Sequence, residues 1–299
     1  MAIPPESGGR RSVIHDIGYS KYDGIRLGEG YTWRTLYELG VKHCYGLGRA
    51  AKYKVLPMLM LAIMLLPALI IVGVQVIVSL DEQVLPYSRY AVIMLFVISV
   101  FVAVQAPALI SRDLRYRVLT LYLARPLRID TYVYARLSAL ATGLFVLVGL
   151  PLLVLYVGSL LSGLSPGSET VDLLGALGGA AILAVMLAAT ATVIAATTTR
   201  RGFAIAAIIT ALLMSYSIVA TVQGIADEQG ATEVAGYAGL FSPFTLVDGI
   251  QVALFDTEAS TSAGPPGALG GLVFVAFAVV IVAGCVLVSL WRYRKVAGR

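Results

Sequence analysis

The stretch Ile110–Tyr134, ISRDLRYRVLTLYLARPLRIDTYVY, is the strongly charged segment between two long apolar runs of the chain. Within it, Leu114, Val118 and Leu121 recur at i, i+4 and i+7, which places them on one face of a short helix. Pro126 then ends that helix. This pattern predicts a short amphipathic helix on a membrane surface, between two spanning helices and facing a partner. The alternative is a solvated basic loop that only fixes the topology.

The composition around this stretch predicts an integral membrane protein. Of the 299 residues, 59% are hydrophobic and only 13% are charged, whereas soluble domains contain about a quarter charged residues. Cys44 lies in a polar region and Cys285 lies in an apolar run, so we expect no disulfide between them. The first residues contain no apolar segment of a secretory signal, so we expect the N-terminus to be retained.

Six apolar runs are long enough to cross about 30 Å of hydrocarbon, which takes about 20 helical residues. The sequence therefore predicts an all-α membrane domain over residues 55–290 with six transmembrane helices. Four prolines lie inside or near the ends of these runs, where neighbouring helices can cover the freed carbonyl groups. The expected spans are residues 55–79, 88–110, 131–161, 171–198, 203–223 and 269–290, and the prolines are Pro57, Pro67, Pro107 and Pro151.

The distribution of Lys and Arg predicts the orientation of these spans. Of the 22 basic residues, all except Arg89 lie before the first span, in the second and fourth loops with their adjoining span ends, or in the tail. The first, third and fifth loops instead contain carboxylates, including Glu169 and Asp248. Because basic residues favour the cytosolic side, we expect both termini in the cytosol.

The regions flanking the membrane domain are expected to be cytosolic. Residues 1–30 are polar and Gly-rich and are interpreted as an N-terminal arm, and residues 291–299 as a tail. Residues 31–54 carry an apolar stripe that begins with Trp33, with Lys and Arg largely off it, which predicts an amphipathic helix in the membrane interface. An ordinary juxtamembrane basic segment is the alternative.

The fifth loop, residues 224–268, contains a second short helical pattern. Ser242 is a candidate N-cap and Pro243 would occupy the first helical position. Phe244, Val247 and Ile250 then share a face with Leu254. This predicts a short external helix that dips into or lies on the outer leaflet, or alternatively a surface helix packed on its own loop.

Several kinds of catalytic chemistry find no support in the residues. No Gly-Lys pair occurs, so there is no P-loop that would bind ATP phosphates. The two histidines, His15 and His43, have no partner at metal-ligand spacing. The apolar runs carry no charged residue at mid-membrane depth, which counts against a secondary transporter and an intramembrane acid/base enzyme. We therefore expect no catalytic, cofactor-binding or metal-binding residues in this chain.

The fifth span is the most polar of the six. Met214, Ser217 and Thr221 share one side of it. Small and hydroxylated residues in a span most often pack helices together, and the lining of a translocation path is the functional alternative.

Residues 107–136, PALISRDLRYRVLTLYLARPLRIDTYVYAR, resemble the signature loop of ABC-2 type transporter permeases. The similarity lies in the charged pair after the second span, a Thr-Leu-x-x-Leu-like stretch and the Arg-Pro pair before the third span. The six-span layout and the Ser-Pro-Phe helix before the last span are similar to that family as well. The resemblance implies that the loop contacts an ATPase, through Arg112, Asp113, Leu114, Arg117, Val118, Tyr122, Arg125 and Pro126.

The resemblance further implies the transmembrane permease subunit of a bacterial ABC exporter in the cell (inner or plasma) membrane. Two separately encoded ATPase subunits would bind ATP and Mg, and a second permease subunit, identical or paralogous, would complete a dimer in the lipid bilayer. No nucleic acid is expected as a partner. The alternatives are an ATP-independent secondary transporter or channel, and a membrane anchor or scaffold for a soluble partner.

Overall fold

The computed structural model describes residues 24, 28–78, 83–110, 127–198, 200–257, 259–261 and 263–297. Every regular element within these residues is a helix. The helices are α1 (Glu29–Cys44), α2 (Lys52–Val78), α3 (Tyr87–Ile93), α4 (Leu95–Leu109), α7 (Ile129–Leu161), α8 (Pro166–Thr197), α9 (Arg201–Glu228), α10 (Thr232–Ala238), the 3-10 helix η1 (Gly239–Phe241), α11 (Pro243–Phe255) and α12 (Gly267–Ala297).

The described helices are those of a multi-pass membrane protein. Five of them, α2, α7, α8, α9 and α12, are long and apolar enough to cross a membrane. A sixth span is obtained if α3 and α4 are counted together. Each predicted apolar run therefore corresponds to helical structure, and the four prolines lie inside helices, as expected.

The second predicted span is broken rather than continuous. α3 and α4 meet at Met94 with a bend of 63°. No Pro or Gly stands at this break, so the local sequence does not explain the bend. Contacts to other helices hold α3 in place, because Tyr90 is fully buried and donates a hydrogen bond to the backbone carbonyl of Met64 in α2.

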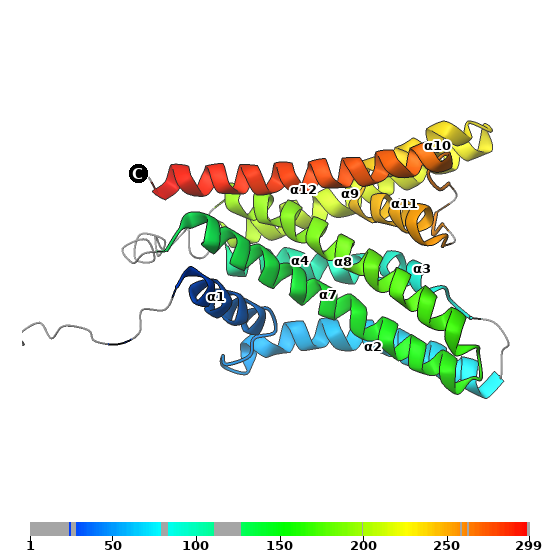
Figure 1. Cartoon of the computed structure of the whole chain (residues 1–299), viewed down its shortest axis with the longest axis horizontal. Helices are drawn as coiled ribbons and strands as arrows, with labels where there is room; N and C mark the ends of the chain where they lie inside the picture. Colours follow the sequence, from blue (N-terminus) through cyan, green and yellow to red (C-terminus); the bar gives the residue numbers. More distant parts are fainter. Residues whose placement is uncertain are drawn as a thin grey trace, which may run out of the picture.

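α8 lies at the centre of the bundle. It contacts α4, α7, α9, α11 and α12, whereas α2 and α12 lie along opposite edges (Figure 1). Close packing around α8 is possible because one side of it is lined with alanines, which let neighbouring helices approach. The buried alanines of α8 include Ala176, Ala180, Ala184, Ala188 and Ala195. The exposed apolar side chains on α2, α9 and α12 form the surface that a membrane would cover.

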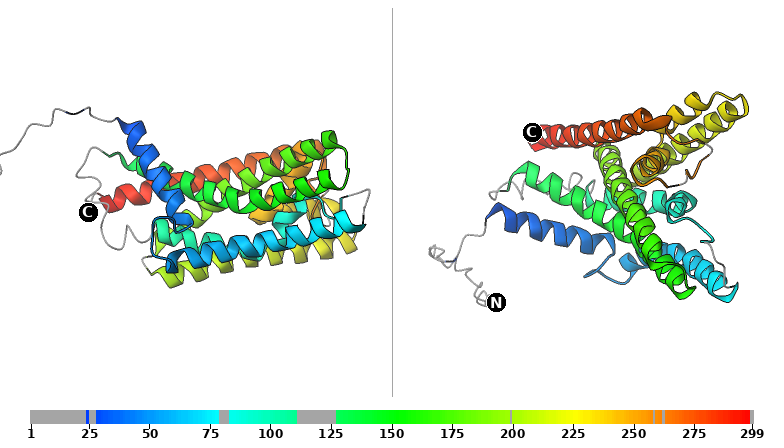
Figure 2. Two further views of the ribbon diagram at one scale, coloured as in Figure 1. Left: turned by 90° about the horizontal axis from the view of Figure 1, so that it is seen from below. Right: turned by 45° about the vertical axis from the view of Figure 1, so that its right-hand side comes forward.

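The two ends of the bundle differ in charge. At one end lie α1, the start of α7 and the end of α12 (Figures 1 and 2), and we name it the basic end. At the opposite end lie α3, α10 and α11, and we name it the acidic end. Described basic residues at the basic end include Lys52, Arg128, Arg200, Arg201, Arg292, Arg294 and Lys295, and carboxylates at the acidic end include Glu169, Asp172, Asp227, Glu228, Glu233 and Asp248.

The helix expected over residues 31–54 is shorter in the structure. α1 ends at Cys44, and α2 begins only at Lys52. Gly46 and Gly48 lie between them with φ angles of 66° and 77°. These are left-handed conformations, which glycine adopts without steric cost and which end a helix.

α11 differs from the interpretation of the external helix as one packed on its own loop. It begins after Ser242 with Pro243 in its first turn, as the sequence predicted. However, α11 packs against α3, α8, α9 and α12 and is buried on all sides over residues 244–251. It is therefore part of the interior of the bundle at the acidic end and is not a helix packed only on its own loop. That it dips into the outer leaflet stays a prediction.

Candidate functional site

The residues predicted to contact an ATPase lie outside the described residues. Arg112, Asp113, Leu114, Arg117, Val118, Tyr122, Arg125 and Pro126 all belong to this group. The structure does describe the two ends of their segment. Ile110, at the end of α4, is buried, and Arg128 is the exposed N-cap residue of α7. The predicted loop therefore leaves and rejoins the helices at the basic end.

An open depression lies at the basic end between α1 and the start of α7. It has a volume of about 580 Å³. Glu29, Gly30 and Trp33 form its wall on α1. The opposite wall consists of Arg128, Asp130, Thr131 and Tyr134 of α7, which follow the predicted loop directly in the chain. This is a surface that a soluble protein can contact, next to the segment with the family resemblance.

An ion pair extends this surface to the last helix. Arg294 of α12 donates a hydrogen bond of 2.9 Å to Asp130 of α7. Arg128 lies 3.8 Å from the other carboxylate oxygen of Asp130. The two arginine side chains are largely exposed and Asp130 is partly exposed, so the ion pairs set the geometry more than they stabilise the fold.

α1 is held against α7 by close packing and side-chain hydrogen bonds. At Gly40 a Cβ atom would lie 2.5 Å from the Cβ atom of Ala139, so only glycine permits the observed approach. The Tyr37 hydroxyl lies 3.0 Å from Thr142 Oγ1. The Tyr45 hydroxyl donates a 2.7 Å hydrogen bond to the carbonyl of Gly143. A displacement of α1 would therefore be transmitted to α7.

Cys44 is buried in this contact and is not a reactive thiol. Its Sγ atom lies 3.9 Å from the carbonyl oxygen of Ala139. Burial raises the pKa of the Cys44 thiol to about 12, although the nearby Arg136 acts in the opposite direction. A thiol with this pKa stays protonated at neutral pH and is a poor nucleophile. The position of Cys44 is thus explained by packing.

Met214, Ser217 and Thr221 share one face of α9, as predicted, and this face points away from the rest of the chain. All three side chains are exposed. The Thr221 hydroxyl donates a 2.8 Å hydrogen bond to the carbonyl of Ser217, so its hydrogen-bond donor is satisfied within the helix. Such a face can meet another helix or line a path formed with a second subunit, and both interpretations of the sequence stay open.

Sequence reasoning did not identify two buried carboxylates at the acidic end. The first is Glu169, in the first turn of α8, which is only 5% exposed. It accepts hydrogen bonds from the Tyr87 hydroxyl of α3, at 2.5 Å, and from Gln83 Nε2, at 2.8 Å to each carboxylate oxygen. The Tyr87 hydroxyl also lies 2.9 Å from Ser159 Oγ of α7. Glu169 therefore connects α8 to the broken span and to α7.

The second buried carboxylate is Asp248 of α11, which is 3% exposed. It accepts hydrogen bonds from the backbone N–H of Ser260, at 2.9 Å, and from the Ser260 hydroxyl, at 2.5 Å. Arg89 of α3 donates a 3.3 Å hydrogen bond to the neighbouring carbonyl of Ala259. Burial raises the pKa of Asp248, while the hydrogen bonds from Ser260 lower it. Asp248 thus holds the segment before α12 against α11.

Within the described part of the chain, these carboxylates do not form a metal centre. Among the residues described by the structure, no three His, Cys, Asp or Glu side chains are grouped so that they could hold a metal ion. Glu169 and Asp248 each have hydroxyl and N–H donors as partners, which is the environment of a structural carboxylate.

In comparisons with known proteins, no family model and no curated protein matches this chain.

Proposed function

We propose that this chain is the permease subunit of an ATP-driven exporter of the ABC-2 type. The observation that carries the proposal is the depression between α1 and the start of α7, which lies beside the segment that resembles the signature loop of that family. A permease without a nucleotide site of its own needs a surface on which a soluble ATPase can act. The depression, the following residues of α7 and the exposed end of α12 supply such a surface.

α1 would be one of the elements that transmit the ATPase's motion. The glycine contact at Ala139 and the hydrogen bonds of Tyr37 and Tyr45 connect α1 to α7 over several turns. α7 in turn packs along α8 and α2. In this proposal a push on α1 or on the loop 111–126 moves α7, and α7 moves the other spans.

The charge segregation supports a definite orientation. Basic residues favour the cytosolic side of a membrane, so we place the basic end, with α1 and the end of α12, in the cytosol. The acidic end then faces outward. In this proposal the chain lies in the cell membrane of a bacterium with both termini inside, pairs with a second permease subunit and binds two ATPase subunits that carry ATP and Mg.

The test is isolation of the chain from its native membranes in a mild detergent, followed by measurement of bound ATPase. We expect a P-loop ATPase in a stoichiometric amount, and nucleotide-dependent transport after reconstitution of the complex. Val118→Pro should abolish coupling while the protein still inserts, because an interior proline costs about 3 kcal/mol of helix stability. Val118→Ala is the matched control and should keep coupling.

Tyr122→Ala should weaken binding of the ATPase by about 2 kcal/mol, because interface energy concentrates in a few central side chains. Arg128→Ala should cost well under that, since this side chain is exposed at the rim. Wild-type ATPase binding and transport in Val118→Pro would show that the loop only fixes the topology.

A second candidate, a secondary transporter, is favoured by one observation. Ion-coupled carriers use buried ionisable groups, and Asp248 and Glu169 are buried carboxylates within the bundle. Transport into proteoliposomes by the purified chain, without ATP and driven by a proton gradient, would support this candidate. Loss of that transport in Asp248→Asn would assign it to the carboxylate.

A further inference from the structure

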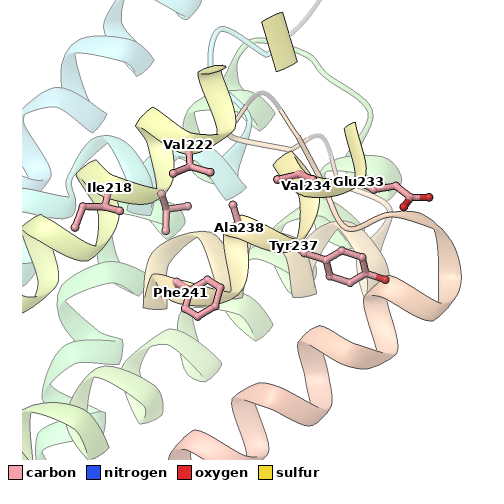
Figure 3. A pocket seen from close by; sticks show the side chains of 8 residues that line it. Ile218, Val222, Glu233, Val234, Tyr237, Ala238 and Phe241 are labelled. Atoms are coloured by element: carbon pink, nitrogen blue, oxygen red, sulfur yellow. The ribbon is translucent and has the colours of Figure 1, made fainter. Parts of the chain in front are cut away.

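An apolar pocket lies at the acidic end between the last turns of α9 and the short helices that follow it (Figure 3). Ile218 and Val222 of α9 form one wall, and Val234, Tyr237 and Phe241 of α10 and η1 form the other. Its volume of about 490 Å³ is within the range of small-molecule sites. No part of the proposed ATPase surface overlaps with this pocket, which lies at the opposite end of the bundle.

The pocket opens on the side of a helix that can span a membrane. Ile218 and Phe241 are 57% and 74% exposed, although both are large and apolar. α9 is one of the spans, so the apolar wall continues directly into the membrane-covered surface of that helix. A hydrocarbon chain that leaves the bilayer can therefore enter the pocket without crossing water.

The outer part of the pocket is negatively charged. Glu233 lines it, and in Figure 3 its carboxylate and the Tyr237 hydroxyl lie on the same side. Asp227 and Glu228 end α9 just before α10, and the C-terminal end of a helix carries a partial negative charge. No Lys or Arg occurs in the sequence from residue 202 to residue 291. This environment attracts a cation and repels a phosphate or carboxylate.

The same charges disfavour a second copy of the chain as the occupant. A two-fold interface centred on the pocket would bring the same patch of both copies together. The Glu233 carboxylates of the two copies would then lie near each other, and like charges in an interface cost binding energy. An anionic lipid meets the same repulsion at its head group.

We propose that this pocket binds a cationic amphiphile, with the hydrocarbon chain between α9 and α10 and the ammonium group at Glu233. The Tyr237 ring adds a face on which a cation can lie. The binding does not depend on an ATPase partner, so it can be measured on the isolated chain whether or not the exporter proposal is correct.

The test uses the full chain in nanodiscs of phosphatidylcholine, with radiolabelled dodecyltrimethylammonium as the probe and empty nanodiscs for subtraction. We expect saturable binding. Ala238→Trp places an indole in the pocket and should weaken binding at least about tenfold, which corresponds to 1.4 kcal/mol. Val279→Trp, at an exposed position of α12, is the matched control and should bind like the wild type.

Glu233→Gln tests the contribution of the ligand's ammonium group separately from that of its hydrocarbon chain. The substitution removes the charge of an exposed side chain and keeps its size. It should weaken binding of dodecyltrimethylammonium about tenfold and leave binding of the uncharged dodecanol unchanged. Dodecyl sulfate should bind more weakly than the cation to the wild type. Equal binding of anion and cation, or unchanged binding in both Ala238→Trp and Glu233→Gln, would overturn the proposal. Loss of a cross-linked dimer in Ala238→Trp with binding intact would assign the pocket to subunit contact and also overturn it.

Discussion

The basic end and the acidic end use charged residues in opposite ways. At the basic end, the exposed Arg128 and Arg294 form ion pairs at the surface with the partly exposed Asp130. At the acidic end, Glu169 and Asp248 are buried and accept hydrogen bonds from hydroxyl and N–H groups of other segments. Exposed charges are available to a partner, whereas buried ones hold helices together.

This difference bears on where movement can originate. An open depression with exposed charges can be reorganised at little cost, because surface ion pairs contribute little to stability. A buried carboxylate cannot lose its partners without leaving them unsatisfied, which costs several times more. We therefore expect a partner to act at the basic end and the acidic end to resist rearrangement.

The largest expected effect is the difference in accessibility of the two ends from outside intact cells. Single cysteines at Gln229 and Arg200, in a chain with Cys44→Ser and Cys285→Ser, would report the acidic and basic ends respectively; both positions are exposed. We expect a membrane-impermeant maleimide to label the cysteine at position 229 and not that at 200. Labelling of both from outside would show that the charge segregation does not correspond to opposite sides of a membrane.

The next largest effect is expected from Glu169→Ala. The change removes the carboxylate that accepts hydrogen bonds from the buried Tyr87 hydroxyl and the partly buried Gln83 amide, although Tyr87 keeps Ser159 as a partner. Loss of a buried hydrogen-bond partner costs about 1–3 kcal/mol, so we expect a loss near the upper end of this range in the free energy of unfolding, measured by circular dichroism in detergent. Glu169→Gln retains one acceptor oxygen and should lose less.

Asp227→Ala is the matched control at the same end, because this carboxylate is exposed at the end of α9. It should change stability by no more than about 0.5 kcal/mol. Similar losses in Glu169→Ala and Asp227→Ala would mean that burial of Glu169 does not contribute to the fold, and the contrast between the two ends would weaken.

The sequence alone could predict the spans, because hydropathy over about 20 residues is a local property. It also predicted the start of α11 from Ser242 and Pro243. It could not place α11 inside the bundle, since Asp248 and Gln251 in this helix are typical of a surface. Their burial follows from contacts with α3, α8 and α12, which are distant in the chain.

The hydrogen-bond partners of the buried carboxylates could not be predicted from the sequence for the same reason. Tyr87 and Glu169 are separated by 82 residues, and no local pattern relates them. Tyr87 lies on α3, which is set off from α4 by the bend at Met94, and no Pro or Gly marks this bend. At the basic end the predicted contact residues 112–126 lie outside the described residues, so their roles stay predictions.

A smaller effect is expected where α1 meets α7. Gly40→Leu would place a side chain against Ala139 and should cost about 1–3 kcal/mol by overpacking. Displacement of α1 would expose Cys44, so in a Cys285→Ser background its alkylation rate should rise. Gly30→Leu is the control, because a Cβ atom there meets nothing within 4 Å. Equal thiol protection in both variants would show that α1 is not held by this contact.

The pH dependence of Cys44 alkylation sharpens this test. Burial raises the pKa of Cys44 to about 12, so a thiol that reacts within the folded contact should show an alkylation rate that increases about tenfold per pH unit from pH 8 to 11. A thiol that reacts only after α1 is displaced has an ordinary pKa of about 8.5, and its rate should level off by about pH 10. Because the pKa is higher in the folded state, this group's stabilising contribution is complete below about pH 8.5 and decreases as the pH rises toward 12. If the alkylation rate of Gly40→Leu levels off near pH 10, Cys44 is exposed in this variant.

The smallest effect is expected for the ion pair between Arg294 and Asp130. The side chains are 62% and 30% exposed, and exposed pairs contribute about 0.2–1 kcal/mol. A double-mutant cycle of Arg294→Ala and Asp130→Ala on the isolated chain should give a coupling energy in that range, which molar salt should remove. The pair connects α12 to α7 beside the depression, so it can break when a partner binds without destabilising the spans. A coupling energy above about 2 kcal/mol that persists in salt would be that of a buried pair. The basic end would then resist rearrangement as the acidic end does, and a partner that binds there would have to supply the energy that breaks this ion pair.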